Sequence, residues 1–290
     1  MFESIGIVAK QDGTEVKFTV EKVVRLLNAR GMRVSIDSES IAHQISGEFE
    51  VCGIAPMAGT CDLVISVGGD GTLLQCAGHI YPRDVPLLGI NLGRLGFLTD
   101  LPPDGVVEEI EKILDGEYTS EERTVLGCEV LRDGSLIANS HALNDVVIQK
   151  WNSARLIALE TYVDGKFVHS QRSDGIIVAT PTGSTAYSLS GGGPILDPQM
   201  NALTIVPICP HSLTNRPLVV RDSGLVEVMV VTEREDESRV TCDGESTQDL
   251  LRGDTIKIYR LRRSITLLHP EKHDHFSTLR AKLNWGSSPC

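Results

Sequence analysis

The chain has 290 residues and a formal net charge of −12, from 39 acidic and 27 basic residues. This length suffices for one large or two medium domains, and the acidic balance argues against a protein that binds nucleic acid or a membrane surface. No apolar stretch approaches membrane-spanning length, and the first residues lack the basic and apolar regions of a signal peptide. The seven cysteines are scattered without a C-x-x-C pair, which predicts reduced thiols and a cytoplasmic location.

The first part of the chain alternates short apolar runs with amphipathic stretches. Branched apolar residues dominate the runs, as is typical of buried parallel strands, and Gly31 and Gly116 follow two of the amphipathic stretches as helix stop signals. Strands that alternate with helices predict an α/β N-terminal domain with a Rossmann-like parallel sheet, over residues 1–120. Its expected strands are 4–9, 32–36, 61–67 and 86–90, and its expected helices are 16–27, 73–80 and 103–114.

The pattern changes near Ser120. From there to residue 268 the chain consists of short apolar runs separated by turn signals such as Val163-Asp164-Gly165 and Asp243-Gly244. This pattern predicts a β-rich, sandwich-like C-terminal domain over residues 121–268. Its expected strands are 125–131, 142–149, 156–163, 166–170, 176–179, 203–208, 218–220, 226–232, 239–242, 255–260 and 264–268. Residues 269–290 remain as a tail, with an expected helix over 277–283.

Three histidines, His269, His273 and His275, lie close together at the start of this tail. A zinc site is one interpretation of this spacing. No cysteine is nearby to complete such a site, so we expect a solvated surface cluster instead.

The stretch Gly68-Gly69-Asp70-Gly71-Thr72 lies where a buried strand is expected to end and a helix to begin. Loops at the carboxyl ends of parallel strands bind ligands in open α/β sheets, and glycines with free N–H groups suit phosphate. The P-loop pattern is absent because no lysine is near, and Leu74 stands where a dinucleotide fingerprint needs its third glycine. Asp70 is therefore a metal ligand, a base that takes a proton from an attacking hydroxyl, or a helix cap in a structural turn.

A second stretch, from Arg172 to Ile195, leads from a buried strand into a turn rich in hydroxyls and glycines. Seven hydroxyl side chains lie between Thr180 and Ser190. Such groups can recognise the edges of a sugar or base, although an ordinary capped turn also uses them. Upstream, Asn144-Asp145 places an amide beside a carboxylate, which can accept hydrogen bonds from a vicinal diol; a simple turn is the alternative.

Together these stretches resemble the NAD kinase family, in its bacterial, ATP-dependent type. The resemblance covers nearly the whole chain and rests on residues 68–72, 91–98, 144–145 and 180–190. The Gly-Gly-Asp-Gly stretch is shared with diacylglycerol, sphingosine and phosphofructo-kinases, so a lipid or sugar kinase is the alternative function. A non-enzymatic dinucleotide sensor is another alternative, but a sensor has no need of a base such as Asp70. The stretch Thr-Pro-Thr-Gly-Ser-Thr-Ala-Tyr is highly specific for NAD kinases.

The resemblance implies an enzyme that transfers the terminal phosphate of ATP to the 2′-hydroxyl of the adenosine ribose of NAD, giving NADP. It also implies Mg²⁺ or another divalent metal, an active site between the two domains, and a homodimer or homotetramer. The tail, residues 269–290, is expected to return to the first domain. Asp70 would accept the proton of the 2′-hydroxyl as its oxygen attacks the terminal phosphorus.

The family's functional residues can be carried over by position. The catalytic carboxylate falls on Asp70, and no residue is assigned as a metal ligand. The nucleotide contacts fall on Asp70, Gly71, Asn144, Asp145, Arg155, Arg172, Asp174, Thr185, Ala186, Tyr187, Ser188, Leu189 and Ser190. Asp174 is our candidate for a residue that a neighbouring chain donates to the pocket. Glu245 departs from the family's pattern, which usually has Gln there, so no ligand contact is carried over to this loop.

Overall fold

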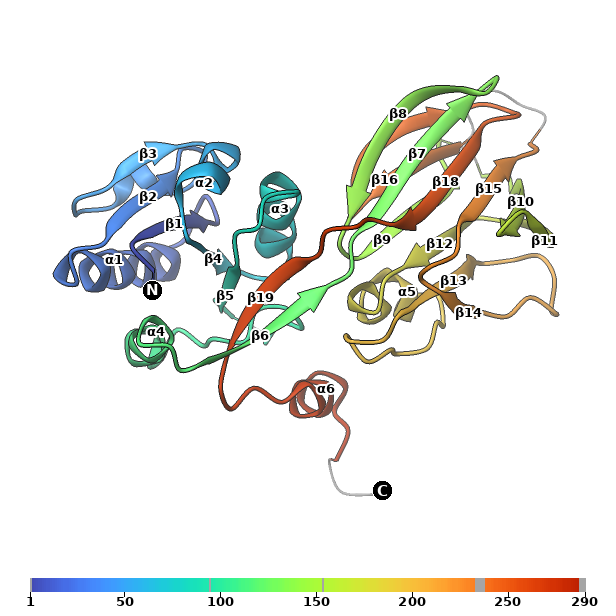
Figure 1. Ribbon diagram of the computed structural model, residues 1–290. Coiled ribbons are helices and arrows are strands. Elements are labelled where there is room, and N and C mark those ends of the chain that lie inside the picture. The colour runs from blue at the N-terminus through green and yellow to red at the C-terminus, as the bar shows by residue number, and fades with distance from the viewer. Residues whose placement is uncertain (1, 94, 153, 233–237, 287–290) are drawn as a thin grey trace. The chain divides into compact units, whose positions relative to one another are not determined.

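The computed structural model describes residues 2–93, 95–152, 154–232 and 238–286. The chain divides into two compact units, one formed by Met1–Glu122 with Ile265–Cys290 and the other by Arg123–Ser264. Figure 1 labels their elements. In the described part of the chain, no helix has the length and apolar character needed to cross a membrane.

The first unit is built on a sheet of seven strands. The strands are β1 (Ser4–Ala9), β2 (Arg33–Asp37), β3 (Glu50–Cys52), β4 (Leu63–Gly68), β5 (Leu87–Asn91), β6 (Tyr118–Arg123) and β19 (Ile265–Pro270). The helices are α1 (Thr14–Ala29), η1 (Ala42–Gln44), α2 (Ile54–Thr60), α3 (Asp70–Ile80), α4 (Val106–Leu114) and α6 (His275–Leu283). The sheet order is β3-β2-β1-β4-β5-β19-β6, and β1 pairs in parallel with both β2 and β4.

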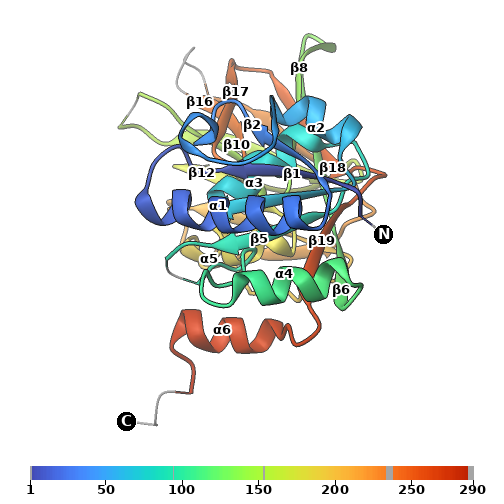
Figure 2. The same ribbon diagram turned by 90° about the vertical axis from the view of Figure 1, so that its left-hand side faces the viewer.

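Apolar side chains on α1 recur at helical spacing and are buried against the sheet. Val20, Val23 and Leu27 join Ile7 and Ile36 in one core, as the period of 3.6 residues requires. Figure 2 shows α1 and α4 next to each other in front of the strands. Helices α2 and α3 contact each other, and both pack on strands of the same sheet. The predicted parallel sheet with helices is thereby confirmed.

Two features of the first unit differ from expectation. Residues 38–58, which show no clear sequence pattern, contain η1, β3 and most of α2. The strand expected at 264–268 is β19, but it was wrongly expected in the β-rich region. Leu267 and Leu268 pair in parallel with Leu87 and Leu88 of β5, so β19 extends the first sheet. An apolar run shows that a strand is buried, but it does not show which sheet it joins.

The second unit contains two antiparallel sheets of six strands each. Their orders are β11-β10-β15-β18-β7-β8 and β14-β13-β12-β9-β16-β17. The strands are β7 (Leu126–Arg132), β8 (Ser135–Ala142), β9 (Asp145–Lys150), β10 (Ile157–Val163), β11 (Lys166–Ser173), β12 (Gly175–Ala179), β13 (Ala202–Ile208), β14 (Leu218–Arg221), β15 (Val226–Val230), β16 (Ser238–Cys242), β17 (Glu245–Leu250) and β18 (Thr255–Arg260). Two short helical turns, η2 (Thr182–Thr185) and α5 (Tyr187–Ser190), follow β12.

One core joins the two sheets of this unit. Val130 and Ile258 of one sheet lie in the same buried cluster as Val146, Ile176 and Val178 of the other. Side chains that alternate along each strand supply this cluster, as expected when two sheets pack face to face. The predicted β-rich sandwich is confirmed.

Candidate active site

The glycine-rich turn connects β4 to α3 in the first unit. Gly68 ends the fully buried strand, and a Cβ at this position would overlap the side chain of Thr72. Asp70 is already the first residue of α3, while Gly69 precedes the helix. Because β1 and β4 are parallel neighbours, their carboxyl ends meet, and the amide of Lys10 donates to the carbonyl of Val67 at 3.1 Å. The turn therefore lies beside a lysine that is distant in the sequence.

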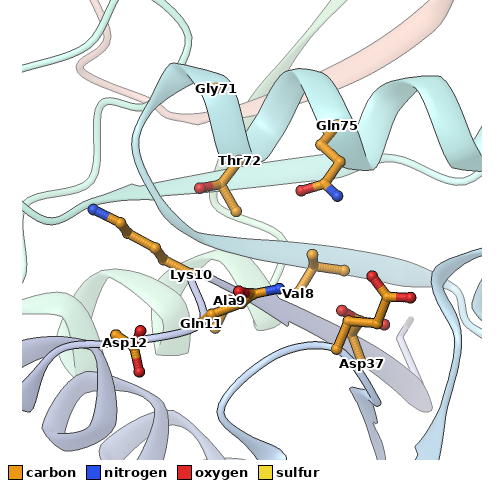
Figure 3. Close-up of a pocket in the computed structure, with 10 residues that line it drawn as sticks. Val8, Ala9, Lys10, Gln11, Asp12, Asp37, Gly71, Thr72 and Gln75 are labelled. Atoms are coloured by element: carbon orange, nitrogen blue, oxygen red, sulfur yellow. The ribbon is translucent and has the colours of Figure 1, made fainter. Parts of the chain in front are cut away.

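A hollow of about 370 Å³ opens beside this turn. The chain passes from β1 to β2 on one side and reaches β4 on the other, so the hollow lies at a switch point where open α/β sheets bind ligands. Thr72 and Gln75 project from α3 toward the end of β1, and Lys10 reaches into the same region (Figure 3). The lining consists of Val8, Ala9, Lys10, Gln11, Asp12, Asp37, Glu39, Gly71, Thr72 and Gln75. An ammonium group beside a glycine turn suits a phosphate.

The carboxylate of Asp70 is held by residues 97–99, in the loop that follows β5. Its Oδ2 accepts from the amide of Phe97 at 2.8 Å. Its Oδ1 accepts from the amide of Leu98 at 3.0 Å and from the amide and hydroxyl of Thr99 at 3.2 and 3.0 Å. A Cβ on Gly96 would overlap Oδ1 of Asp70, so only glycine fits there. The interpretation of Asp70 as the cap of its own helix is wrong, because α3 has no side-chain cap bond.

The second unit has its own hollow, of about 270 Å³. It brings together four of the residues expected to contact the nucleotide: Asn144, Asp145, Ala186 and Tyr187. Asn144 and Asp145 stand where β9 begins, and the short helical turns after β12 supply the other two. The rest of the lining is Val147, Gln149, Thr241, Asp243 and Gly244. An amide, a carboxylate and an aromatic ring around one small hollow suit a sugar with adjacent hydroxyls.

Asp243 organises this hollow, and sequence reasoning missed its role. It stands in the tight turn between β16 and β17, where its φ of 49° and that of Gly244 at 84° are both positive. Its carboxylate accepts from the amides of Leu143 and Asn144, both at 2.7 Å, and from that of Asp145 at 3.1 Å. The sequence shows Asp-Gly as a hairpin signal, and nothing in that signal indicates a distant partner.

The two neighbouring carboxyls of this hollow titrate unusually. Burial, and then the nearby charge of Asp243, raise the pKa of Asp145 to about 7. Burial also raises the pKa of Asp243, although its three backbone donors act in the opposite direction. When one of the two carboxyls carries a proton, that proton belongs on Asp145, because the amides require Asp243 as an acceptor. Strongly perturbed carboxyls in a hollow are typical of functional sites.

The hydroxyl-rich turn uses most of its hydroxyls internally. Thr180 donates to the carbonyl of Leu143 at 2.6 Å, and Ser184 donates to that of Pro181 at 2.6 Å. Thr185 donates to the carbonyl of Thr182 at 3.2 Å, and Ser188 lies 3.1 Å from the hydroxyl of Thr204. Thr180 thereby holds the turn against the residues where β9 begins, while the other three hydroxyls bond within the turn or to β13.

The other expected contacts lie elsewhere in the second unit. Arg155 precedes β10, and Arg172 lies on β11, where both are exposed. Asp174 links β11 to β12 and forms an ion pair with Lys150 at 2.7 Å. Within the described residues, the lining of the hollow does not include Arg155, Arg172, Asp174, Thr185, Ser188, Leu189 or Ser190.

The histidines near the C-terminus do not form a surface cluster, so that expectation is wrong. The side chains of His269 and His273 are 1% and 9% exposed, and both face Asp100. Asp100, His269 and His273 each offer one atom that could bind a metal ion, and these three atoms lie within 4.8 Å of one another. Asp100, which both histidines contact, directly follows Thr99 in the segment that holds Asp70.

The parallel sheet, the lysine at its switch point and the glycine turn define the first unit as an α/β nucleotide-binding protein. Two family models match the chain: the ATP-NAD kinase N-terminal domain over residues 5–118 and the ATP-NAD kinase C-terminal domain over residues 143–269. The chain belongs to the NAD kinase family.

Similar proteins match over almost the full length. The NAD kinase of Nitrosococcus oceani is 44% identical over 98% of this chain and 97% of its own. The NAD kinase of Pseudomonas fluorescens is 43% identical over 99% of this chain and 97% of its own. Among solved structures, yeast NADH kinase complexed with NADH has a TM-score of 0.90 at 25% identity, covering 99% of this chain and 89% of its own. An NAD kinase from Archaeoglobus fulgidus in complex with ATP has a TM-score of 0.76 at 27% identity, covering 96% of this chain and 99% of its own.

Proposed function

We propose that this protein is an ATP-dependent NAD kinase, which transfers the terminal phosphate of ATP to the 2′-hydroxyl of the adenosine ribose of NAD. The observation that carries this proposal is the match to NAD kinases over 98% of the chain, with family models on both the N- and C-terminal parts. The lipid and sugar kinases that share the Gly-Gly-Asp-Gly stretch are the competing class, and no observation favours them.

The first unit holds the phosphate donor in this proposal. The phosphates of ATP lie against Gly71 and Thr72, where the N-terminus of α3 favours anions. Lys10 lines the same hollow and adds a positive charge. This lysine replaces the one that a P-loop carries within its own motif.

The residues at this hollow also fit Mg²⁺. That ion keeps several waters and binds through one or two carboxylates together with substrate phosphates. Asp12 and Glu39 are exposed carboxylates in the lining and offer such ligands. Bound with ATP, the ion would offset charge on the phosphates.

The second unit holds the acceptor. Asp145, in its ionised form, accepts from the two hydroxyls of the adenosine ribose, and Asn144 donates to or accepts from the same sugar. Asp243 fixes both residues through their amides. The remaining predicted contacts, Arg155, Arg172 and Thr185 to Ser190, would bind the rest of the dinucleotide.

Asp70 takes the proton of the attacking hydroxyl. A carboxylate offers about two acceptor sites on each oxygen. Oδ1 of Asp70 already has three donors and Oδ2 has one. Oδ2 is therefore the atom with room for the 2′-hydroxyl, and the loop 96–99 holds it in place while the oxygen attacks phosphorus.

We extend the proposal to the setting of the enzyme. Cys52, Cys61, Cys76, Cys128, Cys209 and Cys242 are free thiols, which supports a cytoplasmic location. The family resemblance supports a homodimer or homotetramer, with Asp174 as the residue contributed to a neighbouring site.

The test is an assay of the purified protein with ATP and Mg²⁺, offered either NAD or a lipid diol. We expect NADP from the first mixture, identified by its 2′-phosphate in a phosphorus NMR spectrum. Phosphorylation of the lipid without formation of NADP would overturn the proposal.

A further inference from the structure

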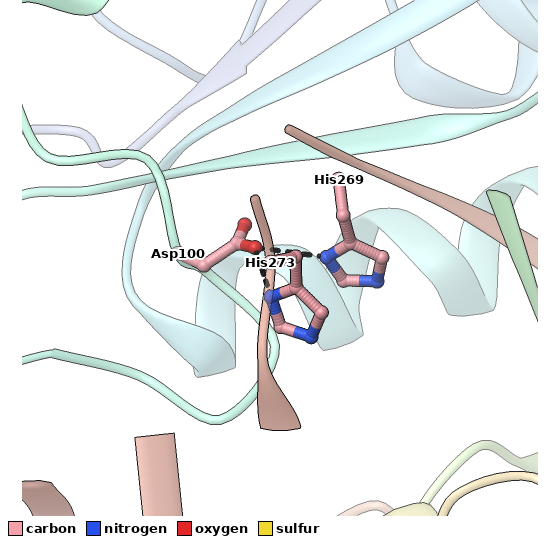
Figure 4. A group of neighbouring side chains, drawn as sticks. All are labelled: Asp100, His269 and His273. Carbon is pink, nitrogen blue, oxygen red and sulfur yellow. Dashed lines mark hydrogen bonds and ion pairs between the residues drawn. The ribbon is translucent and has the colours of Figure 1, made fainter. Parts of the chain in front are cut away.

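A buried cluster of two histidines and one carboxylate lies outside the residues used above. Oδ2 of Asp100 lies 2.9 Å from Nδ1 of His269 and 2.7 Å from Nδ1 of His273 (Figure 4). The two imidazole rings are stacked, with centroids 4.1 Å apart and planes 20° apart. Burial opposes the charge of Asp100, but hydrogen bonds from His269 and His273 lower its pKa to about 2. The carboxylate is thus an ionised acceptor shared by two N–H donors.

The stacked rings argue against a metal ion at this cluster. An imidazole binds a metal along a nitrogen lone pair, which lies in the ring plane, at about 2.0–2.1 Å. Two rings whose planes differ by 20° at a centroid distance of 4.1 Å cannot both place an ion in their planes at that distance. Both Nδ1 atoms therefore act as donors to Asp100.

His269 is held through one nitrogen only. Its Nε2 is buried, forms no hydrogen bond, and lies 3.7 Å from a carboxylate oxygen of Glu121 on β6. Its Nδ1 makes the contact with Asp100. Leu267 and Leu268, the residues before it, pair with β5 and fix the backbone of β19. His269 is therefore a rigid donor aimed at the loop that follows β5.

The segment that Asp100 ends is the same one that holds Asp70. The amides of Phe97, Leu98 and Thr99 all donate to Asp70. On the other side of Asp100, the carbonyl of Leu101 accepts from the amide of Asn91, the last residue of β5, at 2.8 Å. The side chain of Asp100 is thus the one anchored point between the Asp70 contacts and this backbone pairing.

We propose that His269 is a positioning residue for phosphoryl transfer: its Nδ1–H fixes Asp100, which keeps the amides of residues 97–99 on the carboxylate of Asp70. This proposal rests on the assignment of Asp70 as the base. The C-terminal segment of the chain thereby acts on the reacting carboxylate without touching either substrate.

The test compares two amide substitutions at His269. The amide nitrogen of Asn can take the place of Nδ1, whereas that of Gln extends to the place of Nε2, where His269 has no hydrogen bond. We expect His269→Gln to lower kcat about 10–100-fold with little change in KM for ATP or NAD, since small misplacements of a reacting group cost about this much. His269→Asn should keep most of kcat. His43→Gln, at an exposed histidine, is the control with full activity.

A double-mutant cycle with Asp70→Asn separates positioning from general damage. If His269 acts through Asp70, His269→Gln costs nothing further in the Asp70→Asn background. An equal loss in both backgrounds, or equal activity of the Asn and Gln variants, would overturn the proposal. If His269→Gln does not fold, Asp100→Ala removes the contacts of both His269 and His273 from the loop side and must show at least the same kcat loss and the same lack of additivity. If Asp70→Asn is itself fully active, the assignment of the base fails, which is a different result.

Discussion

At the scale of single residues, the ionised carboxyl of Asp145 destabilises the folded protein. Its side chain is buried beside Asp243, and its pKa is raised to about 7, against about 3.9 in an unfolded chain. Between these values the folded protein binds more protons than the unfolded one, so the free energy of unfolding falls as pH rises from about 4 to about 7. Above about pH 7 the carboxyl is ionised in both states, and the loss of free energy of unfolding no longer grows with pH.

We expect Asp145→Asn to stabilise the protein and weaken NAD binding. The gain in free energy of unfolding should be near zero at pH 4 and about 2–4 kcal/mol at pH 8, because only the charged form is penalised. Urea unfolding at pH 4, 6 and 8 measures it. NAD should lose roughly 1.5–3 kcal/mol of binding free energy while ATP changes little. A stability gain that is the same at every pH would contradict this explanation.

Some site residues could be predicted from the sequence and others could not. Asp70, Asn144 and Asp145 stand in short motifs whose chemistry is visible in the residues themselves. Lys10 could not be found, because its place beside the glycine turn depends on β1 lying next to β4. The hydrogen bonds from Thr180 to the carbonyls of Leu143 and Asn144 depend in the same way on partners distant in the sequence.

At the scale of elements, the loop 96–99 is the part of the fold that positions Asp70. The amide of Gly96 donates to the carbonyl of Thr99 at 3.3 Å, which closes a turn around the carboxylate. Thr99 is fully buried, and a Cβ on Gly89 of β5 would overlap it. The loop is therefore fixed on both sides by groups that leave no space for a larger residue.

Gly96→Ala should displace Asp70 and reduce turnover. The added methyl overlaps the carboxylate, so Asp70 or the loop must move, and we expect kcat to fall about 10²-fold. Gly78→Ala is the matched control, since no neighbouring atom lies within 4 Å of the added Cβ in α3. Steady-state kinetics of both variants give the comparison. Unchanged kcat in Gly96→Ala would show that the loop does not set the position of Asp70.

The elements also show where sequence patterns stop being informative. The buried strands of both units were predicted because their apolar runs are continuous or alternate. Strand β8 was missed because it is an edge strand whose only buried residue is Ala142, so it lacks an apolar face. Strand β17 is another edge strand, with a largely polar sequence. The sheet that β19 joins depends on a pairing nearly two hundred residues away in the chain.

At the scale of the whole molecule, the proposed sharing of sites between chains can be tested by complementation. Asp70→Asn and Asp174→Ala should each be nearly inactive alone. When they are mixed under conditions that exchange subunits, about half of the dimers are hybrids, and each hybrid has one intact site if the two residues serve different chains' sites. About a quarter of all sites should then recover, measured as NADP formed per chain.

The control for this experiment is Asp70→Asn mixed with itself under the same conditions. Subunit exchange is verified with differently tagged chains. No recovery despite verified exchange would show that Asp70 and Asp174 serve a site of one chain, and the kinase assignment would be unaffected.

The most direct test of the central claim is the turnover of Asp70→Asn with ATP, Mg²⁺ and NAD. Asparagine keeps the shape of the side chain but cannot take the proton, so we expect kcat to fall about 10²–10⁴-fold while the variant stays folded. NADP is quantified by enzymatic cycling, which detects a small residual rate, and circular dichroism checks the fold. A folded Asp70→Asn protein that forms NADP within a few-fold of the wild-type rate would contradict the claim that Asp70 is the catalytic base.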